Sequence, residues 1–393
     1  MTLVVALMIN NLPAILGDVL ISGHELEQSL SIPTIGDIDK IFPQGSGWSI
    51  TDLIQKVNII DDKLIIGWAG SPIAARVIVS ELKNRHSSQS FTKESLEKFF
   101  IEINNDINRW IAKQEVGFIG YIKDSEGFHL FSHSFNGVII HEVNFPTYGA
   151  IKICGSGTDD MEELLKQVSR RYSNSNLTNF DNVVIELLTL CGWFFADEMS
   201  TSRSLLQYYG GAYEVATYIE EEKSFQKIDD ITYLTWIVQD INIKPKISLI
   251  SKIFKVSYAD NILLVYTIDF NFLQEPTVGR YDSEEYIKFL PTTINLYHIL
   301  PLNTNLKDKM FEMPKQQELP DLINSEFNCN YLFLVTIEPE QASGDEVICK
   351  PLRSSNKKSN YIKFIFEDKQ LFLIVKFTYL EYLKNSFNVS TNS

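Results

Sequence analysis

The first eighteen residues constrain the fold more than any other part of the chain, because they form an almost continuous apolar segment. Between Met1 and Asp18 this segment is interrupted only at Asn10-Asn11 and at Pro13. No Lys or Arg precedes the apolar run and no small-x-small site follows it, so it does not fit a secretory signal peptide. Neither half approaches the roughly 18–20 residues that a membrane-spanning helix needs. Since Asn tolerates positive φ, the pattern predicts a hairpin of two strands, buried on both faces at the centre of a layered sheet.

Length, charge and cysteine content limit the classes of protein to which the chain can belong. Its 393 residues exceed what one hydrophobic core normally serves, so two domains are expected. The formal net charge of −15 argues against binding to nucleic acid or to an anionic membrane, since both need a dense basic surface. The four cysteines form no CxxC pair and the six histidines show no HExxH or HxH spacing, so the sequence indicates neither a metal site nor a disulfide framework. We expect a cytoplasmic protein without a cofactor or bound metal.

Apolar periodicity divides the chain into a mixed part and a strand-rich part. Helices are predicted at Pro72–Lys83, Thr92–Lys113, Thr158–Tyr172 and Asp181–Glu198. Strands near Val116–Ile122, Phe128–Ser132 and Val138–Val143 are predicted to form a meander. From Asp229 onward, stretches rich in Ile, Tyr and Phe predict antiparallel strands without a visible catalytic constellation. We therefore expect one domain over residues 1–228 and a β-rich domain over residues 229–393, whose role is best explained as recognition or docking.

Thr2 stands directly after the initiator methionine, at the start of the first predicted strand. Removal of Met1 would leave a free α-amine beside a β-hydroxyl, a pair in which the amine serves as the base for its own side-chain nucleophile. An α-amine has a pKa of about 7.7–8.0, so part of it is neutral at cellular pH. The simpler explanation is that Thr2 is only a residue that favours a strand.

Four further blocks follow in a fixed order. Gly17-Asp18 ends the second predicted strand, and Lys56 stands fourteen residues before the Gly of an Ala69-Gly70 turn that opens a helix. Gly155-Ser156-Gly157 precedes another helix, and Gly210-Gly211 opens a late strand. Together with Thr2, this layout resembles the proteasome β subunits and the bacterial HslV-type peptidase, which are N-terminal-nucleophile (Ntn) hydrolases. The resemblance covers roughly the first 228 residues.

The resemblance implies a role for each matching residue. Thr2 would be the nucleophile that forms an acyl-enzyme, and Lys56, paired with Asp18, would lower the barrier to its deprotonation. A buried Lys needs such a partner. The N–H of Gly70 would stabilise the oxyanion at a helix N-terminus. Ser156 would bind and orient the N-terminal amine.

The resemblance also implies a fold and a substrate pocket. The fold would be an α+β structure, a four-layer αββα Ntn-hydrolase sandwich, to which the β-rich C-terminal domain is added. The substrate pocket would be lined by Ile21, Ser22 and Trp68, with Trp68 at its floor, where its size would make the pocket shallow.

Two departures weaken the expectation of catalysis. In active proteasome subunits a Ser precedes the late Gly-Gly pair and an Asp lies three residues before that Ser, whereas Tyr209 and Leu206 stand at these places. In addition, 37 residues separate Asp18 from Lys56, about twenty more than in HslV-type peptidases. We expect this insertion, residues 19–55, to be a loop with exposed aromatic residues at Phe42 and Trp48 that serves as a lid or a ring contact.

Single residues also have structural explanations, which leave other functions open. Taken alone, Asp18 is better explained as a surface turn residue after a hairpin, and Lys56 can be explained as an exposed residue at the start of a strand. We expect a threonine peptidase acting on polypeptides in a homo-oligomeric ring, with an ATP-dependent unfoldase as its partner. The alternatives are a non-catalytic Ntn-fold scaffold or binding protein, and an amidase of the same fold that acts on small amides.

Overall fold

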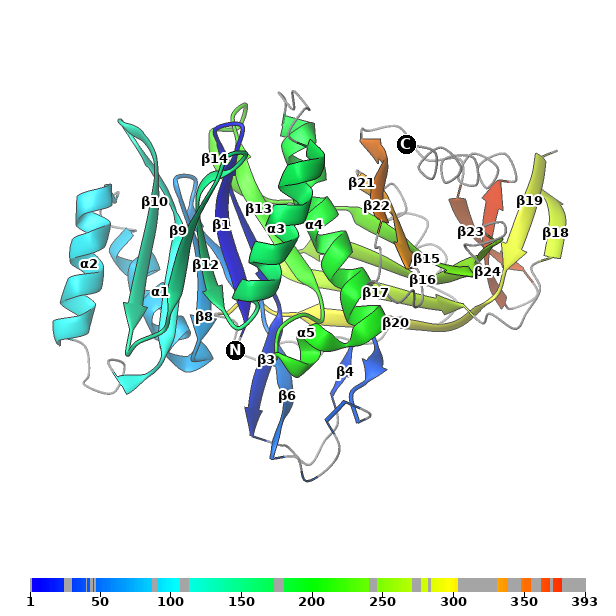
Figure 1. Ribbon diagram of the computed structural model, residues 1–393, viewed down its shortest axis with the longest axis horizontal. Helices are drawn as coiled ribbons and strands as arrows, with labels where there is room; N and C mark the ends of the chain where they lie inside the picture. The colour runs from blue at the N-terminus through cyan, green and yellow to red at the C-terminus, as the bar shows by residue number, and fades with distance from the viewer. Residues whose placement is uncertain are drawn as a thin grey trace. The chain divides into compact units, whose positions relative to one another are not determined.

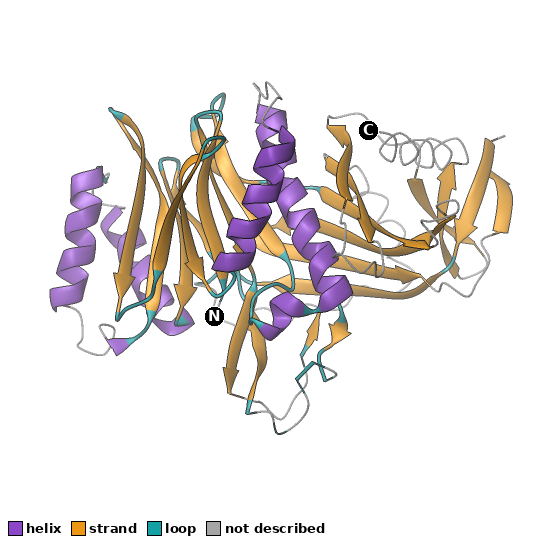
Figure 2. Ribbon diagram, in the orientation of Figure 1, coloured by secondary structure: helices purple, strands orange, loops and turns teal. Residues whose placement is uncertain are grey.

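The computed structural model describes residues 2–24, 30–39, 41–42, 45, 47–86, 91–106, 113–172, 180–239, 246–270, 277–281, 284–302, 331–337, 348–354, 362–367 and 370–376. It is an α+β structure in which nearly all strand pairs are antiparallel (Figures 1 and 2). The chain forms two compact units. Unit 1 consists of Met1–Ile228 together with the short stretches Ala259–Leu263 and His298–Asn305, and unit 2 contains the remainder.

The first sheet of unit 1 has six strands and contains the N-terminal hairpin at its centre. Its strands, in the order β11-β12-β1-β2-β13-β14, are Ile140–Phe145, Gly149–Gly155, Leu3–Ile9, Leu12–Asp18, Tyr213–Ile219 and Ser224–Lys227. The turn between β1 and β2 is formed by Asn10 and Asn11, with φ of 49° and 65°. Nearly every residue of the two strands is buried. The predicted hairpin and its central position are therefore confirmed.

The second sheet of unit 1 has four strands in the order β10-β9-β8-β7. They are Gly127–Phe135, Val116–Asp124, Leu64–Gly70 and Val57–Asp61. The predicted three-stranded meander is wrong in its last strand, because β11 pairs with β12 in the first sheet instead of with β10. Alternating apolar residues show that a strand has a buried face, but they do not show which sheet supplies its neighbour.

The two sheets pack face to face, and helices cover their outer faces (Figure 2). A cluster between the sheets includes Val4, Ile15, Ile65 and Ile119. Helices α1 (Pro72–His86) and α2 (Lys93–Asp106) pack on the second sheet, and α3 (Thr158–Tyr172) and α4 (Phe180–Thr201) contact the first. All four predicted helices are present; the predicted continuation of α2 to Lys113 includes residues 107–112, which lie outside the described residues.

The insertion between Asp18 and Lys56 contains short strands and a small core of its own. Strand β3 (Leu20–His24) pairs with β6 (Trp48–Leu53), and β4 (Ser31–Ile32) pairs with β5 (Gly36–Asp37). Its buried apolar residues pack on Leu205 of the short helix α5 (Arg203–Leu206); they are Leu20, Ile32, Ile38, Phe42 and Ile50. Trp48 is exposed as predicted, whereas the prediction for Phe42 is wrong, because its ring packs in this cluster.

Unit 2 contains strands in two sheets. The six-stranded sheet, in the order β20-β17-β16-β15-β21-β22, comprises Pro291–Ile299, Ile262–Phe270, Lys246–Ala259, Ile231–Gln239, Tyr331–Ile337 and Ile348–Ser354. The four-stranded sheet, in the order β18-β19-β24-β23, comprises Thr277–Tyr281, Glu284–Phe289, Gln370–Lys376 and Ile362–Glu367. One expectation is wrong: β15 and β21 run parallel. None of the helices in the described residues has the length and apolar character that crossing a membrane requires.

Candidate active site

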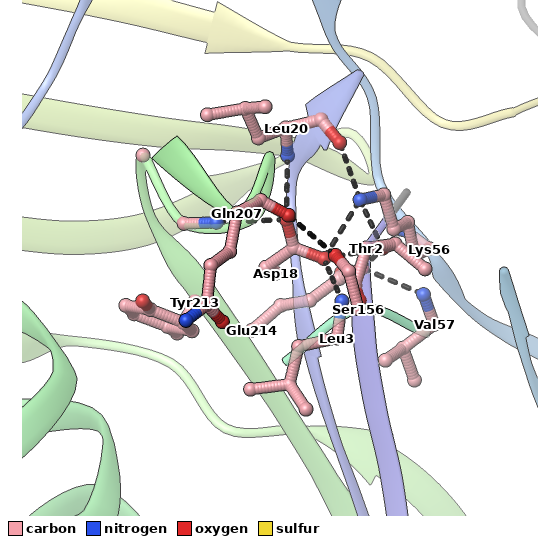
Figure 3. A network of polar contacts seen from close by, with 12 residues as sticks. Thr2, Leu3, Asp18, Leu20, Lys56, Val57, Ser156, Gln207, Tyr213 and Glu214 are labelled. Atoms are coloured by element: carbon pink, nitrogen blue, oxygen red, sulfur yellow. Dashed lines mark hydrogen bonds and ion pairs between the residues drawn. The ribbon is translucent and has the colours of Figure 1, made fainter. Parts of the chain in front are cut away.

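Thr2, Asp18 and Lys56 form one hydrogen-bonded group where the central strand β1 of the first sheet begins and β2 ends (Figure 3). The Thr2 hydroxyl donates to Asp18 Oδ1 at 2.5 Å. The Lys56 ammonium donates to the same Oδ1 at 2.7 Å, to the Leu20 carbonyl at 2.5 Å and to Thr2 Oγ1. Thr2 is 1% exposed, and Asp18 and Lys56 are 0% exposed. The interpretations of Asp18 and Lys56 as surface residues are therefore wrong.

Asp18 is held in place by main-chain donors as well as by side chains. The N–H of Leu3 donates to Oδ1 at 2.8 Å, and the N–H groups of Leu20 and Gly210 donate to Oδ2 at 3.1 Å and 2.9 Å. Burial of a carboxylate is costly unless its oxygens accept hydrogen bonds and a cation lies nearby. Both conditions are met here, so Asp18 is a fixed negative charge beside the Thr2 hydroxyl.

Opposing effects act on the pKa of Lys56. Burial lowers the pKa of its ammonium group, while the attraction of Asp18 and, to a smaller extent, of Glu214 acts in the opposite direction. An amine with a lowered pKa accepts a proton more readily at neutral pH. Because Nζ donates to Thr2 Oγ1 directly, Lys56 is placed to stabilise the alkoxide that forms when the hydroxyl proton leaves, and its amine can take up that proton when it is neutral.

Glu214 supports Lys56 through the main chain, and it was not identified from the sequence. It lies on β13, and its Oε1 accepts the N–H groups of Lys56 and Val57 at 2.5 Å and 2.6 Å (Figure 3). Its Oε2 forms an ion pair with Lys227. Glu214 therefore connects the first sheet to the start of β7 in the second and fixes the point from which the Lys56 side chain extends. A single acidic residue within an apolar strand was the only sequence signal for it.

Replacing Glu214 by Gln is expected to lower the free energy of unfolding by about 3 kcal/mol, because it leaves the ammonium of Lys227 without its buried counter-charge. Glu142→Gln is the matched control. Glu142 pairs with Lys152 at 2.6 Å but is 56% exposed, so its loss should cost at most about 0.5 kcal/mol. Urea unfolding of both variants provides the measurement; equal losses would show that the Glu214–Lys227 pair contributes no more than a surface pair.

The turn at Gly155-Ser156-Gly157 contacts the main chain of Thr2. The Ser156 hydroxyl donates to the Gln207 carbonyl at 2.6 Å and lies 3.4 Å from the Thr2 carbonyl, and the N–H of Gly157 donates to the Thr2 carbonyl at 3.3 Å. Since one hydroxyl has one proton, the shorter bond to Gln207 is the stronger of the two. The predicted contact of Ser156 with a free α-amine depends on removal of Met1, which lies outside the described residues.

Gly70 ends β8 directly before α1, at the predicted strand-to-helix turn. Its φ is +103°, and a Cβ there would overlap the Glu115 carbonyl oxygen, so no other residue fits without a shift of the backbone. Two residues earlier, the N–H of Trp68 donates to the Lys56 carbonyl at 3.2 Å. The strand that carries Gly70 is therefore hydrogen-bonded to the strand that begins beside Lys56.

Two of the three predicted pocket residues pack on the second sheet, and the third, Ser22, lies on β3. Trp68 and Ile21 are buried in the apolar cluster that this sheet shares with α1 and α2. The Trp68 Nε1 and the Ser22 hydroxyl are buried and have no hydrogen-bond partner among the described residues. Their role in a substrate pocket stays a prediction.

The two departures from the proteasome pattern have different environments. Leu206 is 58% exposed on α5. Tyr209 is buried, and its hydroxyl donates to Asp160 Oδ2 at 2.6 Å, while Oδ1 of Asp160 binds Arg203 at 2.6 Å. Tyr209 thus ties the segment before Gly210 to the first turn of α3.

Comparison with known proteins adds no family to this description. The sequence matches no protein-family model, and a search of curated proteins finds no match. Within the described ranges, no group of three or more His, Cys, Asp or Glu side chains is placed to hold a metal ion.

Proposed function

We propose that this protein is a threonine-type peptidase of the Ntn-hydrolase class, with Thr2 as its nucleophile after removal of Met1. The observation that carries the proposal is the buried group in which the Thr2 hydroxyl contacts both Lys56 Nζ and Asp18 Oδ1. Three side chains that are far apart in the sequence meet in the arrangement that activates a hydroxyl nucleophile. If Thr2 served only to favour a strand, its hydroxyl would need neither Lys56 nor Asp18 as a partner.

The architecture of unit 1 supports the same class. Two antiparallel sheets pack on each other between two pairs of helices, which is the arrangement expected of a four-layer αββα Ntn sandwich. Thr2 directly precedes the central strand β1, and Asp18 is the last residue of β2. The hairpin therefore brings the nucleophile and the carboxylate together without a long loop.

The proposed reaction uses the groups described above. Thr2 Oγ attacks the peptide carbonyl carbon while its proton passes to the α-amine or to Lys56, and the N–H of Gly70 stabilises the oxyanion. The C–N bond then breaks, the leaving amine takes up that proton, and an ester to Thr2 remains. Water hydrolyses the ester and regenerates the hydroxyl. Asp18 keeps its charge throughout and orients Lys56.

Covalent labelling tests the proposal. The intact mass of the purified protein should show the loss of Met1, and a peptide epoxyketone should then add one probe per chain at Thr2. Thr2→Ala should abolish labelling and Thr2→Ser should retain it. Thr217→Ser, which alters another buried threonine of the first sheet, should label like the wild type. Retention of Met1, or equal labelling of Thr2→Ala, would contradict the proposal.

A second candidate function is a non-catalytic Ntn-fold binding protein. It is favoured by Tyr209, which replaces the expected Ser and bonds to Asp160 instead of the site. In that case Thr2 stays unlabelled although the chain is folded and Met1 is removed. Turnover of peptides against small amides distinguishes a peptidase from an amidase. The cytoplasmic location, a homo-oligomeric ring and an ATP-dependent unfoldase partner stay predictions.

A further inference from the structure

A second buried carboxylate lies next to the proposed site. Glu198, in the last turn of α4, is 0% exposed. Its Oε1 accepts the Thr34 hydroxyl and the N–H of Gly211 at 3.0 Å, and its Oε2 accepts the Ser204 hydroxyl at 3.1 Å and faces the Tyr213 hydroxyl at 3.4 Å. These partners come from three segments of the chain, which are the insertion, α5 and the stretch from Gly211 to Tyr213. Glu198 therefore acts as a common acceptor that holds them together.

Gly210 and Gly211 connect Glu198 to Asp18. The N–H of Gly210 donates to Asp18 Oδ2 at 2.9 Å, and the next N–H, that of Gly211, donates to Glu198. Both residues have positive φ, 122° and 79°, which directs their consecutive N–H groups towards the two carboxylates. A displacement of Glu198 would therefore move one of the donors that hold Asp18 in place.

Thr34 connects Glu198 to the insertion. It is 1% exposed and lies in the turn between β4 and β5. The apolar cluster around it includes Ile32 and Ile38 from the insertion and Leu205 from α5. The insertion and the segment that precedes Gly210 are therefore packed together, and the Thr34–Glu198 hydrogen bond is a buried polar contact between them.

We propose that Glu198 is a positioning residue, which ties Thr34 of the insertion to the Gly210–Gly211 turn, so that closure of residues 30–39 of the insertion onto Glu198 sets the position of Asp18 and the reactivity of Thr2. The effect on reactivity rests on the function proposed above. The tie between Thr34 and the Gly210–Gly211 turn does not rest on it and can be measured by itself.

The link that Glu198 makes between Thr34 and the Gly210–Gly211 turn depends on pH, because the Glu198 carboxyl can be protonated. Burial raises the pKa of its carboxyl from 4.5 to about 7; the bonds from Thr34, Gly211 and Ser204 oppose this rise, and the negative charge of Asp18 adds to it. Among the described residues, the phenols of Tyr209 and Tyr213 also interact with it.

The sign of this dependence follows from linkage. When the insertion opens, Glu198 reaches water and its pKa returns towards its ordinary value, so the closed form binds the proton more tightly. The advantage of the closed form is complete below that ordinary value and is lost as the pH rises through about 7. Opening should therefore increase with pH, by at most about tenfold per unit within this window.

Hydrogen exchange followed by mass spectrometry, together with peptide turnover, tests the proposal. Thr34→Val replaces the hydroxyl by a methyl group, and it should accelerate amide exchange about tenfold both in residues 31–37 and in residues 204–211, since a buried hydrogen bond is lost. The turnover number should fall by a similar factor of about ten while KM changes little. Thr51→Val is the matched control, since the Thr51 hydroxyl lies in the insertion but bonds only weakly, at 3.4 Å, to Ile21.

Glu198→Gln separates the effect of the hydrogen-bond geometry at this position from the effect of the carboxylate charge. The amide keeps an acceptor for Thr34 and Gly211, so turnover should stay near that of the wild type. The increase of exchange between pH 5 and 7, relative to the intrinsic exchange rate, should disappear because the titrating group is gone.

Each result decides one part of the proposal. If Thr34→Val changes exchange only around residue 34 and leaves residues 204–211 as in the wild type, the tie does not exist. If exchange changes but the turnover number of Thr34→Val equals that of the wild type, Glu198 does not position the site. If the wild type neither labels at Thr2 nor turns over peptides, the proposed function fails, and the exchange result still decides the tie.

Discussion

Lys56→Met is expected to lower peptide turnover by about 100- to 10,000-fold, because it removes the amine that accepts the proton of the Thr2 hydroxyl or stabilises the resulting alkoxide. It is also expected to lower the free energy of unfolding by about 3 kcal/mol, since Asp18 then stays buried without its cation. Turnover assays and urea unfolding measure the two effects separately.

The double variant Asp18→Asn/Lys56→Met distinguishes catalysis from stability. Removing both charges restores most of the lost unfolding free energy, because no unpaired ion is left inside the protein. Turnover should stay as low as in Lys56→Met. Lys152→Met, which breaks a pair whose Glu142 partner is half exposed, should change neither quantity strongly. Full turnover in a folded Lys56→Met variant would contradict the assigned mechanism.

The N-terminal hairpin could be predicted from the sequence because its determinants are local. Two consecutive Asn residues adopt positive φ between two apolar runs, and the runs are long enough to show that both faces are buried. Thr2, Asp18 and Lys56 could be selected only by resemblance to a known layout. Nothing local distinguishes the buried Lys56 from an exposed lysine at the start of a strand.

Glu198 and Glu214 could not be predicted, because their partners are distant in the sequence. Glu214 accepts hydrogen bonds from residues 158 and 157 positions earlier, and Thr34 lies 164 positions before Glu198. A hydrophobic pattern reports which face of an element is buried, but it does not report which polar groups meet there. The same limit explains β11 and β21, whose strand character was predicted but not their partners or direction.

The departures at Leu206 and Tyr209 do not leave the Gly210–Gly211 turn without support. Tyr209 bonds to Asp160, Ser156 bonds to the Gln207 carbonyl, and Glu198 accepts the Gly211 N–H. These contacts hold the segment to α3, to the turn before α3 and to α4. The position of Asp18 therefore depends on a network different from the Ser and Asp that the proteasome pattern led us to expect.

Gly210→Ala is expected to be severely destabilising, at about 3 kcal/mol, and to abolish turnover. The φ of Gly210 is +122°, which is a strained conformation for any residue with a Cβ. The methyl group of the new alanine would also overlap Glu198 Oε2. That oxygen cannot move away freely, because it is buried and accepts the Ser204 hydroxyl. The backbone must shift instead, which breaks the hydrogen bond from Gly210 to Asp18.

Gly137→Ala is the matched control for Gly210→Ala, because it introduces the backbone strain of a positive φ without a steric overlap of the new Cβ. Gly137 has a φ of +83° but open space around its Cβ position, so the substitution should cost only about 1 kcal/mol. In a Glu198→Ala background, which removes the overlap, the cost of Gly210→Ala should fall towards that of Gly137→Ala. Urea unfolding of the four variants measures this coupling. If Gly210→Ala lowers the free energy of unfolding equally with and without the Glu198 side chain, the carboxylate does not restrict the space at Gly210. The position of Asp18 must then be set by the other contacts of this segment.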